Sequence, residues 1–194
     1  MPEVALYKDK FCHGSVGSSE HWLCVSCCGN GVIQVMDSLG SFMMLNLATV
    51  LQICKIYSIP QNHTTLKLRK LPVQQQNGTL DCGLFAVAYA VEVCAGNSPA
   101  DVSFNQKQMR SHLYTCLSDG VMSPFPKVSR AREFLPRPTD RSLNIKVYCT
   151  CKLPEEYDSF MIECESCKQW YHCSCVKIAP QKVPDHWQCS LCST

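Results

Sequence analysis

The feature that most constrains this chain is an ordered series of eight metal-type ligands near its C-terminal end. The spacing is C-x-C, twelve residues, C-x2-C, four residues, His, two residues, Cys, thirteen residues, C-x2-C. The members are Cys149, Cys151, Cys164, Cys167, His172, Cys175, Cys189 and Cys192. Thiolates and imidazoles in sets of four are the donors of structural zinc sites, so the series predicts two zinc ions. A segment of about fifty residues is too small to fold on apolar burial alone, and we expect its folding and zinc binding to be one event.

The alternative for the cysteines is a disulfide framework, which belongs to secreted chains. The first ten residues do not join a basic stretch to an apolar one as a signal peptide does, and the longest apolar run, Leu84 to Val91, is too short to span a bilayer. We therefore expect a soluble, intracellular chain without a membrane partner, in which the sixteen cysteines are thiols or zinc ligands.

Length and composition suit one or two globular domains, with 194 residues of which 46% are hydrophobic and 18% charged. The formal net charge of +2 argues against a general nucleic-acid-binding surface. Residues 127–146 differ from the rest because they carry six Lys or Arg against two acids and contain Pro136 and Pro138. We interpret them as a basic linker; a targeting or DNA-contacting patch is the alternative. The predicted domains are residues 1–126 and 147–194.

The ligand order of four cysteines, one histidine and three cysteines resembles a PHD finger over about residues 147–193. The resemblance implies a cross-brace in which the ligand sets interleave along the chain. Cys149, Cys151, His172 and Cys175 would hold one zinc ion, and Cys164, Cys167, Cys189 and Cys192 the other. Trp187, two residues before the last cysteine pair, also fits the pattern. RING-type ubiquitin ligase modules share the cross-brace and are the alternative, although they usually open with C-x2-C.

PHD fingers commonly bind histone tails, so the resemblance implies a nuclear protein whose partner is the N-terminal tail of histone H3. Readers of methyl-lysine surround the cation with apolar, electron-rich side chains. Tyr148, Met161 and Trp170 match the cage positions of that class, and Tyr157 is the candidate for a fourth wall.

Acidic residues surround these candidate cage positions and suit a basic peptide that binds as an added strand. They are Glu155, Glu156, Asp158, Glu163 and Glu165. The alternative is that the cage residues simply cover the small core of the finger and that the acidic run is a solvated face.

The N-terminal region alternates between strand-like and helix-like segments, which predicts an α+β domain. The expected strands are residues 21–28, 31–37 and 64–69, and the expected helices are residues 45–54, 82–95 and 104–117. The first two strands would form a hairpin. Cysteines at positions 24, 27, 28, 54, 94 and 116 are interpreted as small buried apolar residues.

Cys82 differs from those cysteines because a polar turn leads directly from Asn77 into the buried helix that begins with it. The N-terminus of a helix favours a thiolate, which makes Cys82 a candidate nucleophile. His21 and Asp37 stand at adjoining ends of the predicted hairpin and are the candidates for a general base and its acidic partner. Gln76 would supply an oxyanion hole together with the backbone amide of Cys82, although the spacing leaves Gln75 open as the alternative.

These residues resemble the SUMO-specific protease family, adenain-like cysteine peptidases that cut after the C-terminal glycine of ubiquitin-like modifiers. The matches, in order, are His21-Trp22, Val35-Met36-Asp37-Ser38, Gln75-Gln76 and Asp81-Cys82-Gly83-Leu84-Phe85. The resemblance implies a papain-like lobe, a SUMO-like modifier as partner, and a role for Trp22 beside the channel that admits the modifier's tail.

In that family a substantial segment precedes the His-Trp pair, whereas twenty residues precede it here, so we expect an N-terminally truncated lobe. Two hypotheses follow. The chain is either an isopeptidase brought to chromatin by its finger, or a zinc-dependent chromatin reader that carries a non-catalytic, degenerate protease scaffold.

Overall fold

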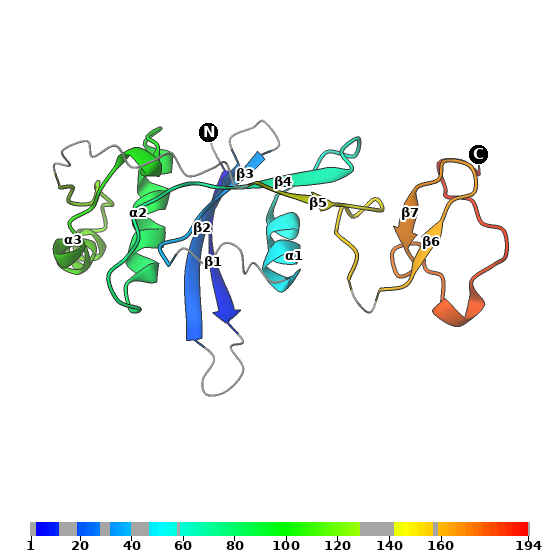
Figure 1. Ribbon diagram of the computed structural model, residues 1–194, viewed down its shortest axis with the longest axis horizontal. Coiled ribbons are helices and arrows are strands. Elements are labelled where there is room, and N and C mark those ends of the chain that lie inside the picture. The colour runs from blue at the N-terminus through cyan, green and yellow to red at the C-terminus, as the bar shows by residue number, and fades with distance from the viewer. Residues whose placement is uncertain are drawn as a thin grey trace. The chain divides into compact units, whose positions relative to one another are not determined.

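The computed structural model describes residues 3–11, 19–27, 32–39, 47–57, 59–128, 142–156 and 159–193 (Figure 1). Its strands are β1 (Glu3–Phe11), β2 (Ser19–Cys27), β3 (Val32–Met36), β4 (Thr65–Lys70), β5 (Ser142–Lys146), β6 (Met161–Glu163) and β7 (Trp170–His172). Its helices are α1 (Leu47–Ile56), α2 (Cys82–Cys94) and α3 (Gln106–Asp119), with short 3-10 turns at Pro99–Asp101 and Pro180–Lys182. The described residues confirm a mixed fold of helices and strands with a small cysteine-rich region.

The chain divides into two compact units, and the division passes through β4 and β5. One unit combines Met1–Leu45 with Lys67–Leu143, and the other combines Asn46–Leu66 with Asn144–Thr194. Part of the predicted linker is regular structure, because residues 142–146 form β5, while residues 129–141 lie outside the described residues. The domain boundaries drawn from the sequence stay a prediction.

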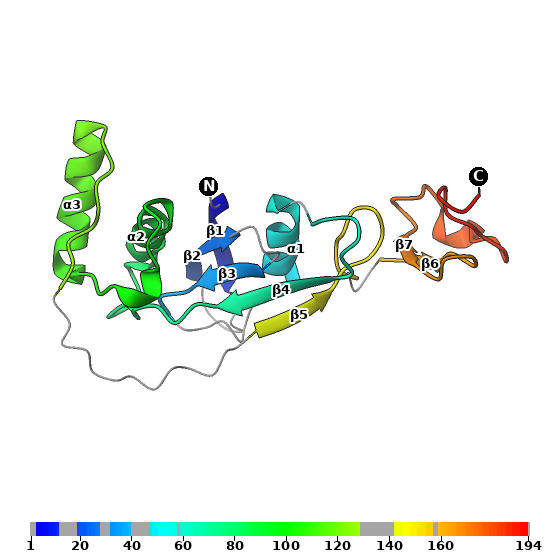
Figure 2. The ribbon, with the colours of Figure 1, turned by 90° about the horizontal axis from the view of Figure 1, so that it is seen from above.

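A five-stranded sheet has the order β1-β2-β3-β4-β5. β1 and β2 are antiparallel, from Glu3 opposite Cys27 to Phe11 opposite Ser19, and β2 and β3 are antiparallel with Cys24 opposite Met36. β3 and β4 run parallel, as Figure 2 shows. The predicted pairing of two strands into an antiparallel ladder is therefore confirmed, although the turn between them lies outside the described residues.

Helix α2 packs against β1 and β2 and supplies six of the thirteen buried residues of the main apolar cluster (Figure 1). Its sequence is apolar nearly all round, which is typical of a buried helix. Phe85 and Tyr89 contact Phe104, and Phe104 contacts Phe125 edge to face. This aromatic cluster packs on the first two turns of α2, the helix that begins at Cys82.

Helix α3 is amphipathic as predicted, with Met109 and Cys116 buried, and it ends at Gly120 in the left-handed conformation that glycine adopts without strain. The interpretation of Cys94 was wrong, because it is exposed. It is the last residue of α2, where the helix leaves the core. Within the described residues, no helix combines the length and the apolar character that a membrane span needs.

The cysteine-rich region contains one short antiparallel ladder, in which β6 pairs with β7. Its core is formed by Ile162, Tyr171 and the buried ligand cysteines, and Tyr171 stacks edge to face on Trp187 with ring centroids 5.3 Å apart. A core this small depends on additional crosslinks for stability.

Candidate functional site

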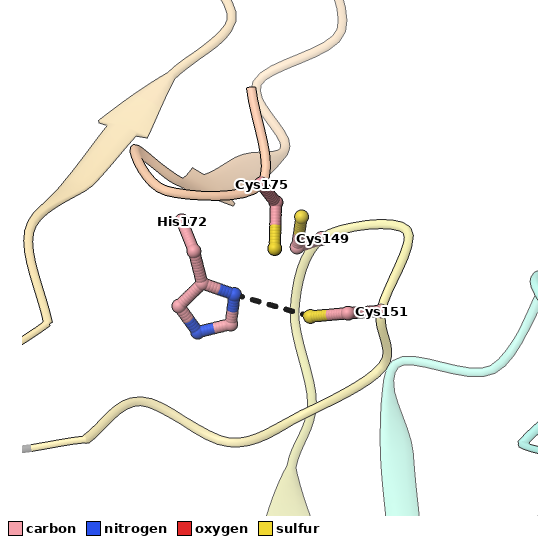
Figure 3. A group of neighbouring side chains, drawn as sticks. All are labelled: Cys149, Cys151, His172 and Cys175. Carbon is pink, nitrogen blue, oxygen red and sulfur yellow. Dashed lines mark hydrogen bonds between the residues drawn. The ribbon is translucent and has the colours of Figure 1, made fainter. Parts of the chain in front are cut away.

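The first candidate metal centre gathers Cys149, Cys151, His172 and Cys175, whose ligand atoms all lie within 4.8 Å of one another. Figure 3 shows the four side chains converging from separate segments of the chain. Nδ1 of His172 faces the Cys151 sulfur at 3.2 Å, while its Nε2 lies 3.4 Å from the Pro154 carbonyl. A zinc-bound histidine normally donates its other N–H to such an acceptor, so this geometry identifies Nδ1 as the metal ligand.

The second centre gathers Cys164, Cys167, Cys189 and Cys192, again with all sulfur atoms within 4.8 Å. The sulfur atoms of Cys167 and Cys189 are 3.9 Å apart. Four sulfurs at a Zn–S distance of 2.3 Å on a tetrahedron would be separated by about 3.8 Å, so the cluster already has nearly the required size. The two sets interleave along the sequence as predicted.

The electrostatics of the sulfur atoms favour a bound dication. Backbone N–H groups, first that of Cys167, outweigh burial and lower the pKa of the Cys164 thiol to about 6. The N–H of Cys189 also donates to this sulfur at 3.3 Å. By contrast, the hydrogen bond with Cys189, together with burial, raises the pKa of Cys192 to about 12. Thiolates this close repel one another, and a Zn²⁺ ion would remove that penalty.

The backbone around the ligands adopts a conformation that side chains rarely accept. Cys149, Lys152, Lys168 and Lys177 have positive φ values between 54° and 60°. Such left-handed residues cost roughly 1–2 kcal/mol each, and they recur here within two residues of a ligand cysteine. These residues stand beside the ligand cysteines, where the backbone N–H groups of Cys151 and Cys167 point to the sulfur atoms of Cys149 and Cys164.

The candidate cage residues lie around the β6–β7 ladder. Because Met161 pairs with His172 and Glu163 pairs with Trp170, Met161 and Trp170 lie on the same face in diagonal positions. Trp170 is 44% exposed, so it does not belong to the core, which is filled by Tyr171 and Trp187 instead. The Cys149 N–H donates to the Trp170 carbonyl at 2.9 Å, so the segment that contains Tyr148 and Cys149 lies beside β7.

Tyr148 is half-buried and packs partly on the finger core, so it supports that core as well as the face. Tyr157, the candidate for the fourth wall, lies outside the described residues. The described acidic residues, Glu155, Glu156, Glu163 and Glu165, are exposed. Exposed acidic side chains therefore stand close in sequence to the cage positions, and Glu163 lies opposite Trp170 in the ladder.

A second cluster of chemically active side chains lies in the other unit. Nε2 of His21 is 2.7 Å from Oδ1 of Asp37, and both residues are 1% exposed. Cys82 is the first residue of α2 and is 6% exposed. Burial lowers the pKa of His21, but hydrogen bonds and charges from Asp37 and Cys82 outweigh burial and raise it above 6.5. The structure thus brings together the three predicted residues.

The glutamines at positions 75 and 76 tie the segment after β3 to the segment before α2. Gln75 Nε2 donates to the carbonyls of Asp37 and Val73, at 3.1 and 3.2 Å. Gln76 Oε1 accepts from the Ser38 hydroxyl at 2.6 Å, and Gln76 Nε2 donates to the Gly78 carbonyl at 2.8 Å. Ser38 stands in the matched motif, but the sequence assigned it no role, because its contact with Gln76 joins residues 38 positions apart.

Trp22 lies over the start of α2. A Cβ atom added at Gly83 would meet Trp22 Cδ1 at 3.5 Å, an ordinary contact distance. The indole is 37% exposed, so one face covers the residue next to Cys82 while part of the ring meets solvent.

Comparison with known proteins assigns the class of the zinc-binding region. Residues 138–194 match the family model described as PhD finger domain, and all eight ligands lie inside that match. The chain therefore carries a PHD finger domain, and its two four-ligand clusters fit two zinc ions. The match favours the PHD interpretation over the RING alternative. The peptidase resemblance of residues 1–126 stays a prediction.

Several chromatin proteins are similar to part of this chain. Chromatin remodeling protein EBS of Arabidopsis thaliana is 44% identical over 52 residues, which are 26% of this chain and 22% of that protein. Lysine-specific demethylase phf2 of Danio rerio is 49% identical over 41 residues, 21% of this chain and 4% of that protein. Histone lysine demethylase PHF8 of Danio rerio is 41% identical over 51 residues, which are 25% of this chain and 5% of that protein. The chain thus spans less than a quarter of these relatives.

Proposed function

We propose that the PHD finger binds the N-terminal tail of histone H3 and selects a methylated lysine in it, which would make this protein a nuclear chromatin reader. The observation that carries the proposal is the exposure of Trp170 on the same face as Met161. A tryptophan whose ring is not needed for the core is available to a ligand, and indole is the best aromatic partner for a quaternary ammonium ion.

The ladder also offers a place for the peptide backbone. Of the strands in the described residues, β6 pairs only with β7, so its other edge is open to an added strand. The outer edge of β7 already binds Cys149 through the Trp170 carbonyl. A basic tail added to β6 would run beside exposed Glu163, and that charge favours lysine- and arginine-rich peptides.

The relatives agree with this partner, because their names describe chromatin remodelling and histone demethylation. The test is calorimetric titration of the zinc-loaded full chain with a trimethylated and an unmodified H3 N-terminal peptide. We expect the trimethylated peptide to bind about 5- to 30-fold more tightly, corresponding to about 1–2 kcal/mol. Equal affinities would reject methyl-lysine selection, and no binding of either peptide would reject the histone partner.

A second candidate function is favoured by the buried His21–Asp37 contact beside Cys82. We propose a papain-like, ubiquitin-like-protease lobe that cuts after the C-terminal glycine of a SUMO-like modifier. The Cys82 thiolate would attack the glycine carbonyl, and the protonated His21 would give its proton to the departing amine. Because Asp37 engages Nε2 of His21, proton exchange with the sulfur would fall to Nδ1.

The remaining predicted roles are compatible with this geometry. Both amide protons of Gln75 have backbone acceptors, so Gln76 is the better candidate for the oxyanion hole. Trp22, lying over Gly83, would flank the path of the modifier's glycine tail.

The test is labelling of the full chain by a SUMO-type modifier that bears a C-terminal electrophile. We expect labelling of wild type, loss of labelling in Cys82→Ala, strong slowing in His21→Ala, and no effect of Cys54→Ala, because burial raises the pKa of the Cys54 thiol to about 11. Reaction with a small alkylating agent but not with the modifier would indicate a preserved catalytic pocket without a surface that binds the modifier. Reaction with neither would support the non-catalytic scaffold and the reader function alone.

A further inference from the structure

The side chain of Gln106, on α3, is hydrogen-bonded to both ends of the loop that leads into Cys82. Gln106 Oε1 accepts a hydrogen bond from the Asn77 N–H at 2.8 Å, and Gln106 Nε2 donates to the Asn77 carbonyl at 2.9 Å. The same Nε2 donates to Asp81 Oδ2 at 2.7 Å. The amide of Gln106 therefore spans the loop from Asn77 to the residue that directly precedes Cys82.

Asp81 occupies the N-cap position of α2 but makes no side-chain hydrogen bond to that helix. Aspartate is a favoured N-cap residue because its carboxylate accepts bonds from the first amides of the helix. Here both of its oxygens are directed to α3, with Oδ2 bound by Gln106 and Oδ1 bound by Arg110 at 2.6 Å. The carboxylate is thus drawn away from the helix end that carries Cys82.

This arrangement has an electrostatic consequence for the thiol. The first amides of a helix have no intrahelical acceptor and carry partial positive charge, which stabilises a nearby anion. A carboxylate that capped α2 would occupy those amides and add a negative charge next to the sulfur. Both effects disfavour a thiolate at Cys82.

We propose that Gln106 and Arg110 are positioning residues for Cys82. They hold the Asp81 carboxylate off the N-terminus of α2, so that the amides there serve the sulfur anion and the developing oxyanion. Arg110 also places a compensating positive charge on Asp81. The proposal rests on the thiol chemistry proposed above for Cys82, and it deepens that chemistry because it explains how an acid can precede the nucleophile without suppressing it.

The test is the pH profile of alkylation by iodoacetamide, measured on the zinc-loaded full chain with the rate at Cys82 read by peptide mass spectrometry. In Arg110→Met the pH of half-maximal rate should rise, and the rate at pH 7 should fall about 3- to 10-fold. Gln106→Leu should act in the same direction. Lys107→Met, an exposed neighbour on α3, should leave the profile unchanged.

The decisive variant adds Asp81→Ala to Arg110→Met, because alanine can neither cap the helix nor carry charge. We expect the double variant to return the midpoint toward that of wild type. A rate lowered equally at every pH, without recovery in the double variant, would assign Arg110 a merely structural role and overturn the proposal. An unchanged profile in Arg110→Met would overturn it as well and would leave the peptidase function standing.

Failure of the peptidase function itself has a different signature. Cys54 is buried to the same 6% exposure as Cys82, and burial raises the pKa of its thiol to about 11, so it is a matched internal reference. Wild-type Cys82 that alkylates no faster than Cys54 across the pH range would reject the nucleophile and, with it, the role of α3.

Discussion

His21 and Asp37 form a buried contact of 2.7 Å between Nε2 and Oδ1, although they stand sixteen residues apart. His21 lies in β2, and Asp37 directly follows β3. The same Asp37 oxygen accepts the backbone N–H of Leu39 at 2.8 Å, which fixes the carboxylate. Two ionisable groups that are each 1% exposed must be paired to be tolerated. The contact therefore orients the imidazole whether or not Cys82 is catalytic.

The pH dependence of this pair has a definite sign. The pKa of His21 is raised in the folded protein, so the fold favours the imidazolium, and this stabilisation is complete below about pH 6.5. It is lost as the pH rises through the folded pKa. Asp37→Asn should lower the pKa of His21, because burial is then opposed by Cys82 alone, and NMR titration of the imidazole measures that change.

The same variant should lower the free energy of unfolding by about 2 kcal/mol at pH 6 and by less at pH 9. Chemical denaturation at both pH values, with zinc present, measures the two losses. Asp101→Asn, at an exposed site of the same unit, is the matched control and should change neither value. A loss in Asp37→Asn that grows with pH would contradict the assigned sign.

Metal content is the second prediction. The purified chain should contain two zinc ions, and Cys164→Ser or His172→Ala should remove at least one and unfold the finger, because each deletes a ligand that the apo chain cannot replace. Elemental analysis and near-UV circular dichroism measure the two effects. Cys173→Ala is the control, since Cys173 is buried but belongs to neither cluster. One equivalent or less in wild type would reject the two-site cross-brace.

The third prediction concerns Glu92, a carboxylate on α2 that is 1% exposed and binds Lys127 at 2.9 Å and Asn97 at 3.0 Å. Lys127→Met should leave this buried charge without its cation and lower the free energy of unfolding by about 1–3 kcal/mol. The lower part of this range allows for the partial exposure of the lysine side chain. Chemical denaturation tests this, with Lys107→Met expected to stay within about 0.5 kcal/mol of wild type. An equal effect of both variants would show that the ion pair adds nothing.

The zinc clusters could be predicted from the sequence because their ligands occur in closely spaced pairs. Each C-x2-C pair is a turn whose two sulfurs must converge, and only the pairing between turns is long-range. The His21–Asp37 contact was predictable for a similar reason, because two strands joined by a short turn bring their ends together. In both cases residue type and spacing alone limit the geometry.

The parts that escaped sequence analysis depend on partners distant in the chain. The strand β1 contains Lys8, Asp9 and Lys10, a polar run without the apolar alternation that predicts a strand. It is a strand because its backbone pairs with β2 along the whole of its length. The side-chain hydrogen bonds from Gln106 and Arg110 to Asp81 join residues 25 and 29 positions apart, and such contacts leave no periodic pattern in the sequence. Cys94 was expected in the core as a small apolar residue, yet it is the last residue of α2 and is exposed.

The most direct test of the reader function is the effect of Trp170→Ala on the preference for a trimethylated over an unmodified H3 N-terminal peptide, measured by calorimetry on the zinc-loaded chain. Because Trp170 is 44% exposed and outside the core, the variant should fold and keep two zinc ions. We predict that the preference of about 1–2 kcal/mol disappears in Trp170→Ala and persists in Leu191→Ala, an exposed apolar control in the finger. A Trp170→Ala protein that retains the full wild-type preference would contradict the assignment of this face as the methyl-lysine site.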